Sequence, residues 1–171
     1  LSTWNFRQNI PTPTYLVSIQ IGRYRQLEEE LSGVTVHTFF PPAHQSKVTS
    51  DLSKLENMLS FFSETFGEYP FESYTVVATA DELEIPLEAQ GMAIFGANHL
   101  NGTNPEERLV AHELAHQWWG NHVTCASWCD IWLNEGFASY SEYLMLAALY
   151  NGQQANHTRW RRRPAKNWDH P

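Results

Sequence analysis

The sequence has few basic residues and almost no cysteine. Lys and Arg number 11 against 19 Asp and Glu, so the formal net charge of the 171 residues is −8 at pH 7. A nucleic-acid partner is not expected, because binding to nucleic acid needs a clustered basic surface and the basic cluster Arg159–Arg163 is short. The two cysteines, Cys125 and Cys129, are too few for a disulfide framework or a structural zinc site of their own, and we expect reduced thiols rather than a local disulfide.

Long apolar runs are missing as well. No stretch approaches the ~20 apolar residues that cross a bilayer, so we expect no transmembrane segment in this chain, and no signal peptide is recognisable. The sequence begins at Leu1 rather than Met and ends at Pro171 within a polar run, which makes both ends look truncated. We therefore expect a cytoplasmic location only by default, since a lost signal would leave the same sequence.

What is present fits a globular protein with a sizeable core. Hydrophobic residues make up 42% of the chain and charged residues 18%, and the length suits one ordinary domain. Alternating or β-rich runs predict strands, and apolar stripes of period three to four predict helices. The strands are expected at 14–24, 34–40, 74–78 and 92–95, and the helices at 46–66, 104–120, 130–150 and 152–163. Strands and helices in this order indicate an α+β fold.

The motif His-Glu-Leu-Ala-His at residues 112–116 lies inside the helix expected at 104–120. Residues at i and i+4 share one face of a helix, so His112 and His116 can reach the same ion from adjacent turns. Zinc accepts neutral imidazole nitrogen readily. Glu113 lies ~100° around the helix from His112. It borders such an ion without ligating it, which suits a base that acts on water at the metal.

A hydrolytic zinc site has three protein ligands and one open position, so two histidines leave it one ligand short. Glu135, on the helix expected at 130–150, follows His116 after a gap of eighteen residues. That gap lets one helix end, a loop turn and a second helix return to the ion. Glu142 is the other carboxylate of that helix. Because it lies about two turns further on, we expect it to point along the helix and away from the metal.

Residues 112–140 read HELAHQWWGNHVTCASWCDIWLNEGFASY. This segment resembles the zinc aminopeptidases of the gluzincin clan, the aminopeptidase N relatives, in its HExxH motif, its eighteen-residue gap, Trp118-Trp119-Gly120-Asn121 and Asn134-Glu135-Gly136-Phe137. Residues 15–22 resemble the last strands of that family's N-terminal saddle domain. The resemblance implies a thermolysin-like catalytic domain over residues 41–171, truncated at its C-terminus. It also implies that residues 1–40 are the end of an N-terminal β-domain.

The resemblance implies a role for each motif residue. His112, His116 and Glu135 become the ligands of one Zn²⁺ per chain. Glu113 becomes the general base that activates water and passes the proton to the leaving amine. Asp130 and Asn134 become candidate partners for the second nitrogen of each imidazole, since ligating histidines usually donate it to an oxygen. Asp130 could equally serve only the start of its own helix.

Family aminopeptidases carry an upstream Gly-Ala-Met-Glu-Asn motif whose Glu holds the free α-amine of a peptide substrate, and this sequence departs from it. Aligning Met92 with the Met of the motif places Ala93 at the Glu position and removes the anchor. Aligning residues 85–89 instead retains a carboxylate at Glu88, 24 residues before His112. We prefer the second register, because an exopeptidase needs fixed negative charge near the substrate ammonium. The alternative is that Glu88 is a surface loop carboxylate.

The predicted function is hydrolysis of the N-terminal bond of peptides with a free N-terminus, by metal-activated water. The alternatives are a thermolysin-like endopeptidase, which would not need Glu88, and a non-catalytic zinc-binding relative. The tyrosine that stabilises the oxyanion in the family has no positional match before Pro171, because the tyrosines after Glu135 follow it too closely. We therefore expect a catalytic-domain fragment with impaired activity.

Overall fold

The computed structural model describes residues 3–102 and 107–150, which form a five-stranded mixed sheet and several helices. The strands are β1 (Arg25–Leu31), β2 (Val34–Phe40), β3 (Ser73–Ala78), β4 (Leu87–Ala89) and β5 (Met92–Phe95). Their spatial order is β1-β2-β3-β5-β4. The pairs β1–β2 and β4–β5 are antiparallel, whereas β2–β3 and β3–β5 are parallel. The strand β4 is therefore a short edge strand whose one partner in the sheet is β5.

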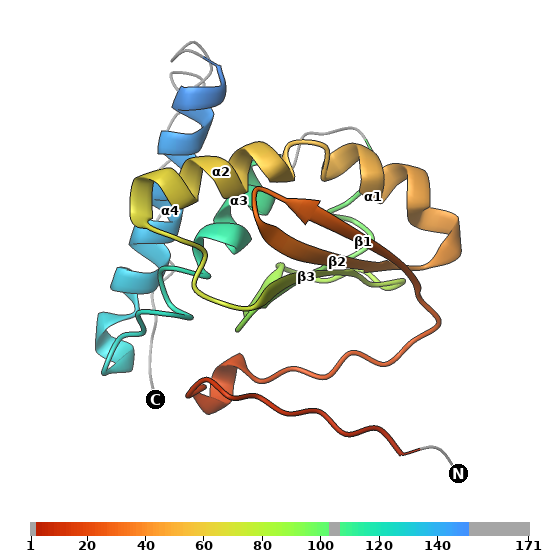
Figure 1. Ribbon diagram of the computed structural model, residues 1–171, viewed down its shortest axis with the longest axis horizontal. Coiled ribbons are helices and arrows are strands. Elements are labelled where there is room, and N and C mark those ends of the chain that lie inside the picture. The colour runs from red at the N-terminus through yellow and green to blue at the C-terminus, as the bar shows by residue number, and fades with distance from the viewer. Residues whose placement is uncertain (1–2, 103–106, 151–171) are drawn as a thin grey trace.

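The helices are α1 (Gln45–Asp51), α2 (Leu55–Phe66), α3 (Glu107–Ala115) and α4 (Trp132–Leu149), with 3-10 turns η1 (Thr14–Leu16), η2 (Pro42–His44) and η3 (Trp128–Asp130). In Figure 1, α1 and α2 lie over one side of the sheet, and the N-terminal segment, residues 3–24, runs along the other side. Helix α3 contacts both α2 and α4. None of the described helices is long and apolar enough to cross a membrane.

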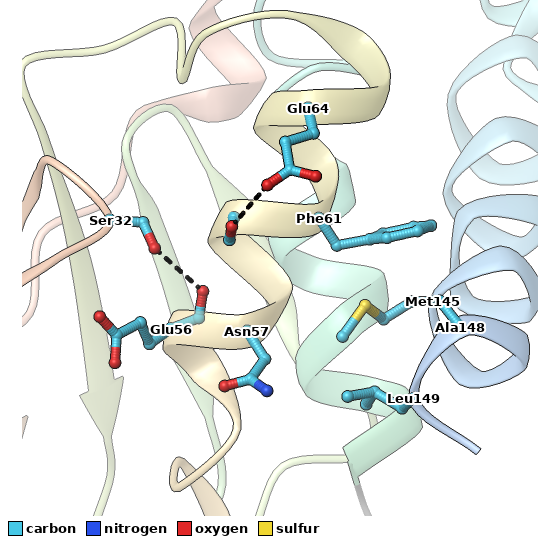
Figure 2. Close-up of a pocket in the computed structure, with 9 residues that line it drawn as sticks. Ser32, Glu56, Asn57, Phe61, Glu64, Met145, Ala148 and Leu149 are labelled. Carbon is cyan, nitrogen blue, oxygen red and sulfur yellow. Dashed lines mark hydrogen bonds between the residues drawn. The ribbon is translucent and has the colours of Figure 1, made fainter. Parts of the chain in front are cut away.

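A groove of about 450 Å³ lies between α2, α4 and the turn that joins β1 to β2 (Figure 2). Phe61 of α2 and Met145 of α4 are among its apolar lining residues. Glu64, also in the lining, accepts a hydrogen bond from the Ser60 hydroxyl at 3.0 Å. The described lining residues include neither histidine nor cysteine, so the metal chemistry expected from the sequence must lie elsewhere.

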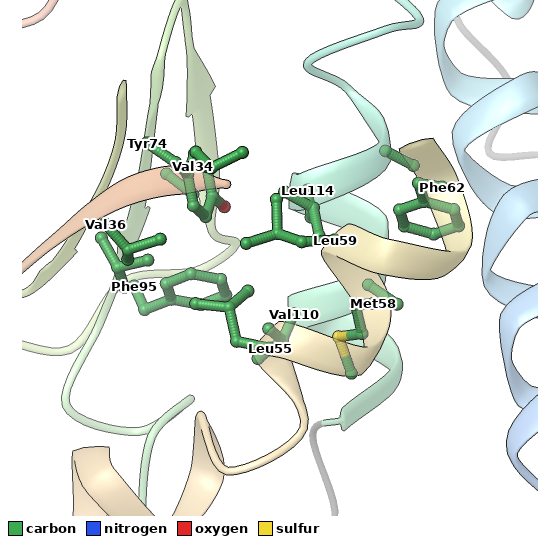
Figure 3. Close-up of a cluster of buried hydrophobic side chains, with 14 of the residues drawn as sticks. Val34, Val36, Leu55, Met58, Leu59, Phe62, Tyr74, Phe95, Val110 and Leu114 are labelled. Carbon is green, nitrogen blue, oxygen red and sulfur yellow. The ribbon is translucent and has the colours of Figure 1, made fainter. Parts of the chain in front are cut away.

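The hydrophobic core fills the space between the sheet and the helices. Residues two apart in a strand, and three or four apart in a helix, share one face, so the alternating burial of β2 and the apolar stripe of α2 can pack together. Core residues that Figure 3 labels come from both layers: Val34, Val36, Tyr74, Phe95, Leu55, Met58, Leu59, Phe62, Val110 and Leu114. The last two belong to α3, so the core places the helix that carries the HExxH motif.

The strands predicted at 34–40, 74–78 and 92–95 are confirmed as β2, β3 and β5, and the helix predicted at 130–150 is confirmed as α4. The single helix predicted at 46–66 is wrong, because a turn at residues 52–54 separates α1 from α2. Both helices turn their apolar residues toward the same core. The apolar spacing of three to four residues therefore continues across the turn, and the sequence alone does not show the interruption.

The helix predicted at 104–120 ends earlier than expected, at Ala115. Its first residues, and the helical piece predicted at 152–163, lie outside the described residues. Cys125 and Cys129 are not bonded to each other, as expected. The domain division at residue 40 stays a prediction; β2, which precedes it, pairs with β3 in the same sheet.

The strand predicted at 14–24 is wrong. Thr14–Leu16 forms a 3-10 turn, and within the described residues the rest of this stretch joins no strand ladder. The alternating side chains of Val17, Ile19 and Ile21 are 64%, 74% and 91% exposed. Alternation produces a strand only where a neighbouring strand supplies hydrogen bonds, and here the neighbour is missing from the described sheet. Strand β1, by contrast, was not predicted, because five of the seven residues in its RQLEEEL sequence are polar, although Leu27 and Leu31 pack against the core.

We predict that Phe62→Ala lowers the free energy of unfolding by about 3–5 kcal/mol, the usual cost of removing a fully buried aromatic ring. Phe62 is 0% exposed and packs against Phe66 and Trp118. The matched control is Phe6→Ala, because Phe6 is 87% exposed and its loss should change the same quantity by no more than about 0.5 kcal/mol. The free energies are measured by urea unfolding. Equal losses in the two variants would contradict the placement of Phe62 in the core.

Candidate metal centre

Helices α3 and α4 bring the three predicted ligands together. Nε2 of His112 lies 3.0 Å from Nε2 of His116 and 3.4 Å from Oε2 of Glu135, while His116 Nε2 and Glu135 Oε2 are 3.7 Å apart. His116 follows the last residue of α3, but its backbone N–H still bonds to the His112 carbonyl at 3.1 Å. The two imidazoles therefore remain one helical turn apart on one face.

These separations suit a tetrahedral zinc ion. Bonds of about 2.0–2.1 Å from zinc to nitrogen or carboxylate oxygen place tetrahedral ligand atoms about 3.3–3.4 Å from one another. The three observed distances lie on both sides of that value. Two imidazoles and one carboxylate are also a donor set that zinc prefers. Residues His112, His116 and Glu135 thus fit the ion in both chemistry and spacing.

Each imidazole is oriented by an acceptor at its other nitrogen. Nδ1 of His116 lies 3.0 Å from the Trp119 carbonyl oxygen, and Nδ1 of His112 lies 2.5 Å from Oε1 of Glu142. A carbonyl and a carboxylate oxygen can only accept, so the Nδ1 atoms are the donors. Both Nε2 atoms therefore face Glu135, and each could ligate a metal ion there once its ring is in the neutral form.

The expectation that Glu142 points away from the site is wrong. Seven residues are about two helical turns, so Glu142 and Glu135 share one face of α4, and the His112 ring lies between them. Glu142 is buried, and its second oxygen accepts a hydrogen bond from Arg108 of α3 at 2.8 Å. The spacing of seven from Glu135 is the sequence signal that could have identified it.

Asp130 and Asn134 are not the hydrogen-bond partners that the sequence suggested for the imidazoles. Asp130 is exposed at the end of η3. Asn134 is buried, but its amide donates to the hydroxyl of Tyr15 at 3.4 Å. The second nitrogens of the two histidines are instead held by Glu142 and by a backbone carbonyl. Every residue has a backbone carbonyl, so no sequence motif could have identified this acceptor.

The chain after α3 is shaped by a glycine and a tryptophan. Gly120 has φ +118°, and a Cβ there would lie 3.2 Å from the Asn134 amide nitrogen and 3.4 Å from His116 Nδ1. Any other residue would therefore crowd the Asn134 amide beside the imidazole and strain the backbone. Trp118 points to the opposite side, where its indole N–H donates to the Gly67 carbonyl at 3.0 Å. The sharp exit from α3 is thus anchored to the end of α2.

Glu113 lies beside these ligands as a buried carboxylate. It is 4% exposed, and its Oε2 has no hydrogen-bond partner among the described residues. Burial above all, together with the negative charges of Glu88, Glu135 and Glu142, raises the pKa of Glu113 to about 8 against the opposing effect of His112. A buried carboxylate with an unoccupied oxygen and a raised pKa can accept and release a proton near neutral pH.

Glu88 faces the same site from the edge of the sheet. A carboxylate oxygen of Glu88, one of Glu113 and a nitrogen of His116 all lie within 4.8 Å of one another. Glu88 belongs to β4, a strand that the sequence did not predict, and its register partner on β5 is Ala93. Directly opposed residues of an antiparallel pair share one face, so both residues considered for the substrate anchor lie on the same side of one hairpin.

The carboxylates make the centre strongly attractive to positive charge. Burial lowers the pKa of His112, but its hydrogen bonds to Glu135 and Glu142 outweigh that effect and raise the pKa to about 10. The hydrogen bond from His112 in turn lowers the pKa of Glu135. The groups that attract a proton to this imidazole also attract a metal cation, which must displace that proton when it binds.

Comparison with known proteins places this centre in a family. Residues 50–169 match the model of the peptidase family M1 domain. The chain is 36% identical over 157 residues to aminopeptidase Ey of Gallus gallus and 34% identical over 157 residues to aminopeptidase N of Homo sapiens, covering 83% and 82% of this chain and 16% of each relative. It is 34% identical over 163 residues to aminopeptidase M1-B of Oryza sativa subsp. japonica, covering 88% of this chain and 18% of that protein.

The chain thus spans about a sixth of the length of the curated relatives that it matches. The matched region contains α3, α4 and all three converging ligands. The family match and the relatives confirm the resemblance found in the HExxH segment, and the chain belongs to peptidase family M1.

Proposed function

We propose that this chain carries the zinc centre of an aminopeptidase, which hydrolyses the N-terminal bond of peptides with a free N-terminus. The observation that supports the proposal most is the convergence of His112, His116 and Glu135 beside a buried, unpartnered carboxylate oxygen of Glu113. The relatives that the chain resembles are named aminopeptidases. The finer fold assignment, a thermolysin-like domain over 41–171 after the end of a saddle domain, belongs to the same proposal.

In this proposal His112, His116 and Glu135 hold one Zn²⁺. When bound, the ion supplies a Lewis acid that makes nearby water more acidic and polarises the substrate carbonyl. Glu113 takes the proton of the attacking water on its carboxylate and passes it to the nitrogen of the departing amine. Its burial favours this role, because a raised pKa lets the carboxylate bind the proton firmly and still release it near neutral pH.

In this proposal Glu88 is the residue that makes the site specific for the N-terminus of a peptide. Its carboxylate faces Glu113 and His116 from β4, and a fixed negative charge there would bind the ammonium group of a substrate N-terminus by charge-assisted hydrogen bonds. An endopeptidase would have no use for this charge, which is why we favour the aminopeptidase. A non-catalytic role is less well supported, because the three ligands and Glu113 all converge.

We predict that the purified chain binds about one zinc per molecule and that His112→Ala loses most of it, because His112 provides one of three ligands. The measurement is elemental analysis after refolding with zinc and dialysis. His122→Ala is the matched control, since His122 is exposed and lies outside the ligand cluster. Absence of zinc from the unchanged chain would contradict the proposed centre.

The second prediction separates the base from the ligands. Glu113→Gln should keep the zinc, whereas in an active protein that contains this chain and extends past residue 171 it should lower kcat by about 10²-fold to 10⁴-fold. A longer protein is used because the chain spans about a sixth of the length of its curated relatives. If Glu113→Gln lost zinc as fully as His116→Ala does, Glu113 would be a ligand and the proposed roles would be wrong.

The third prediction concerns Glu88. In the same active protein, Glu88→Gln should lower kcat/KM for free-amine peptides by about 10-fold to 100-fold, the value of one hydrogen bond to a charged group. N-acetylated peptides should be poor substrates of the unchanged protein. Glu84→Gln is the control, because Glu84 is exposed four residues earlier in the chain. Equal cleavage of acetylated and free peptides would favour the endopeptidase.

A further inference from the structure

Gln117 directly follows the second histidine of the motif and is 0% exposed. Its Oε1 accepts a hydrogen bond from the Gly91 backbone N–H at 2.9 Å. Its Nε2 lies 3.3 Å from the Ala89 carbonyl, 3.5 Å from the Met92 carbonyl and 3.4 Å from the Glu113 carbonyl. Apart from the contact with its own helical turn, every one of these bonds ends on the β4–β5 hairpin.

That hairpin turns through two residues, Gln90 and Gly91, between the paired residues Ala89 and Met92. Gly91 has φ +72°, a conformation that glycine adopts without strain. The turn leaves the Gly91 N–H and the Ala89 carbonyl directed at the chain that follows α3, where Gln117 meets both. A second amide, that of Asn121, also donates to the Ala89 carbonyl at 2.9 Å.

The hairpin needs this support because β4 is only three residues long and lies at the edge of the sheet. A short edge strand is held weakly by its own ladder. Glu88 occupies its central position, one residue before the carbonyl that Gln117 and Asn121 both contact. A shift of the turn away from α3 would therefore carry the Glu88 carboxylate away from Glu113 and His116.

We propose that Gln117 is a positioning residue that ties the β4–β5 turn to the metal-binding helix, so that Glu88 stands at a fixed distance from the metal centre. The proposal rests on the proposed role of Glu88 as the anchor of the substrate amine. It links two parts of the site that the sequence separates: the residue next to the ligand His116 sets the place of a carboxylate 29 residues upstream. Gln117 itself touches neither metal nor substrate.

The test is a double-mutant cycle between Gln117→Leu and Glu88→Gln in a zinc-loaded, active protein that contains this chain. Gln117→Leu should raise KM for an aminoacyl 4-nitroanilide by about tenfold, as expected when a charged hydrogen bond is lengthened, with kcat and zinc affinity changed by less than about threefold. In the Glu88→Gln background the same substitution should leave KM unchanged, because coupled residues are not additive.

A merely structural Gln117 would lower kcat/KM by the same factor in both backgrounds, and that result would overturn the proposal. A loss of zinc by Gln117→Leu would also overturn it. Unchanged KM in Glu88→Gln alone would instead contradict the proposed function, so the two failures differ. Asp51→Asn is the control for a buried polar change remote from the hairpin, since Asp51 accepts from Gly102 at the end of α1; its KM should stay normal.

Asn121→Ala provides a second, milder variant in case Gln117→Leu does not fold. It removes the other amide bond to Ala89 and should raise KM in the same direction by a smaller factor. Hydrogen exchange of the Gly91 amide in the zinc-loaded chain measures directly whether its hydrogen bond to Gln117 is present. That amide should exchange faster in Gln117→Leu while the amides of α3 keep their protection, and unchanged exchange at Gly91 would contradict the tie.

Discussion

The His112 imidazole lies between two carboxylates of a single helix, and the arrangement of the site depends on that contact. Its Nε2 faces Glu135 and its Nδ1 donates to Glu142, both on the same face of α4. The ring can reach both only if α3 and α4 pack in one register, since a slide of one residue shifts a helix by about 1.5 Å. The geometry of the metal ligands therefore depends on how α3 packs against α4.

Contacts between aromatic rings hold that register. Trp118, just after α3, packs edge-on against Phe62 and Phe66 of α2. The next residue, Trp119, stacks on Phe137 of α4 with ring centroids 5.0 Å apart. Two adjacent tryptophans thus tie the end of the ligand helix to two different helices. Large rings bury much apolar surface with few rotatable bonds, which makes them effective supports for a site that tolerates little movement.

Three of the carboxylates next to the histidines, those of Glu113, Glu135 and Glu142, differ because their surroundings differ. Burial raises the pKa of Glu113, whereas the hydrogen bond from His112 lowers that of the half-exposed Glu135. The first environment suits a group that exchanges protons, and the second suits an anionic ligand. Glu142 lies behind His112 with Arg108 at its other oxygen, so its negative charge is matched on both sides. One cluster can thus supply ligand, base and support.

Local periodicity in the sequence predicted the parts whose structure depends on near neighbours. The spacing of His112 and His116 places both on one helical face, and the gap to Glu135 allows a second helix to return. Strands β2, β3 and β5 could be read from their apolar runs, since each is buried among the strands and helices around it. For these elements the local pattern and the tertiary packing agree.

Tertiary structure alone decided the features that need a distant partner. Residues 14–24 alternate like a strand but find no ladder in the described sheet, whereas the polar β1 becomes a strand because β2 pairs with it. The roles of Glu142 and Gln117 depend on what a second element places opposite them. A hydrogen bond or an ion pair belongs to two groups at once, so a sequence can show one partner while only packing decides where the other lies.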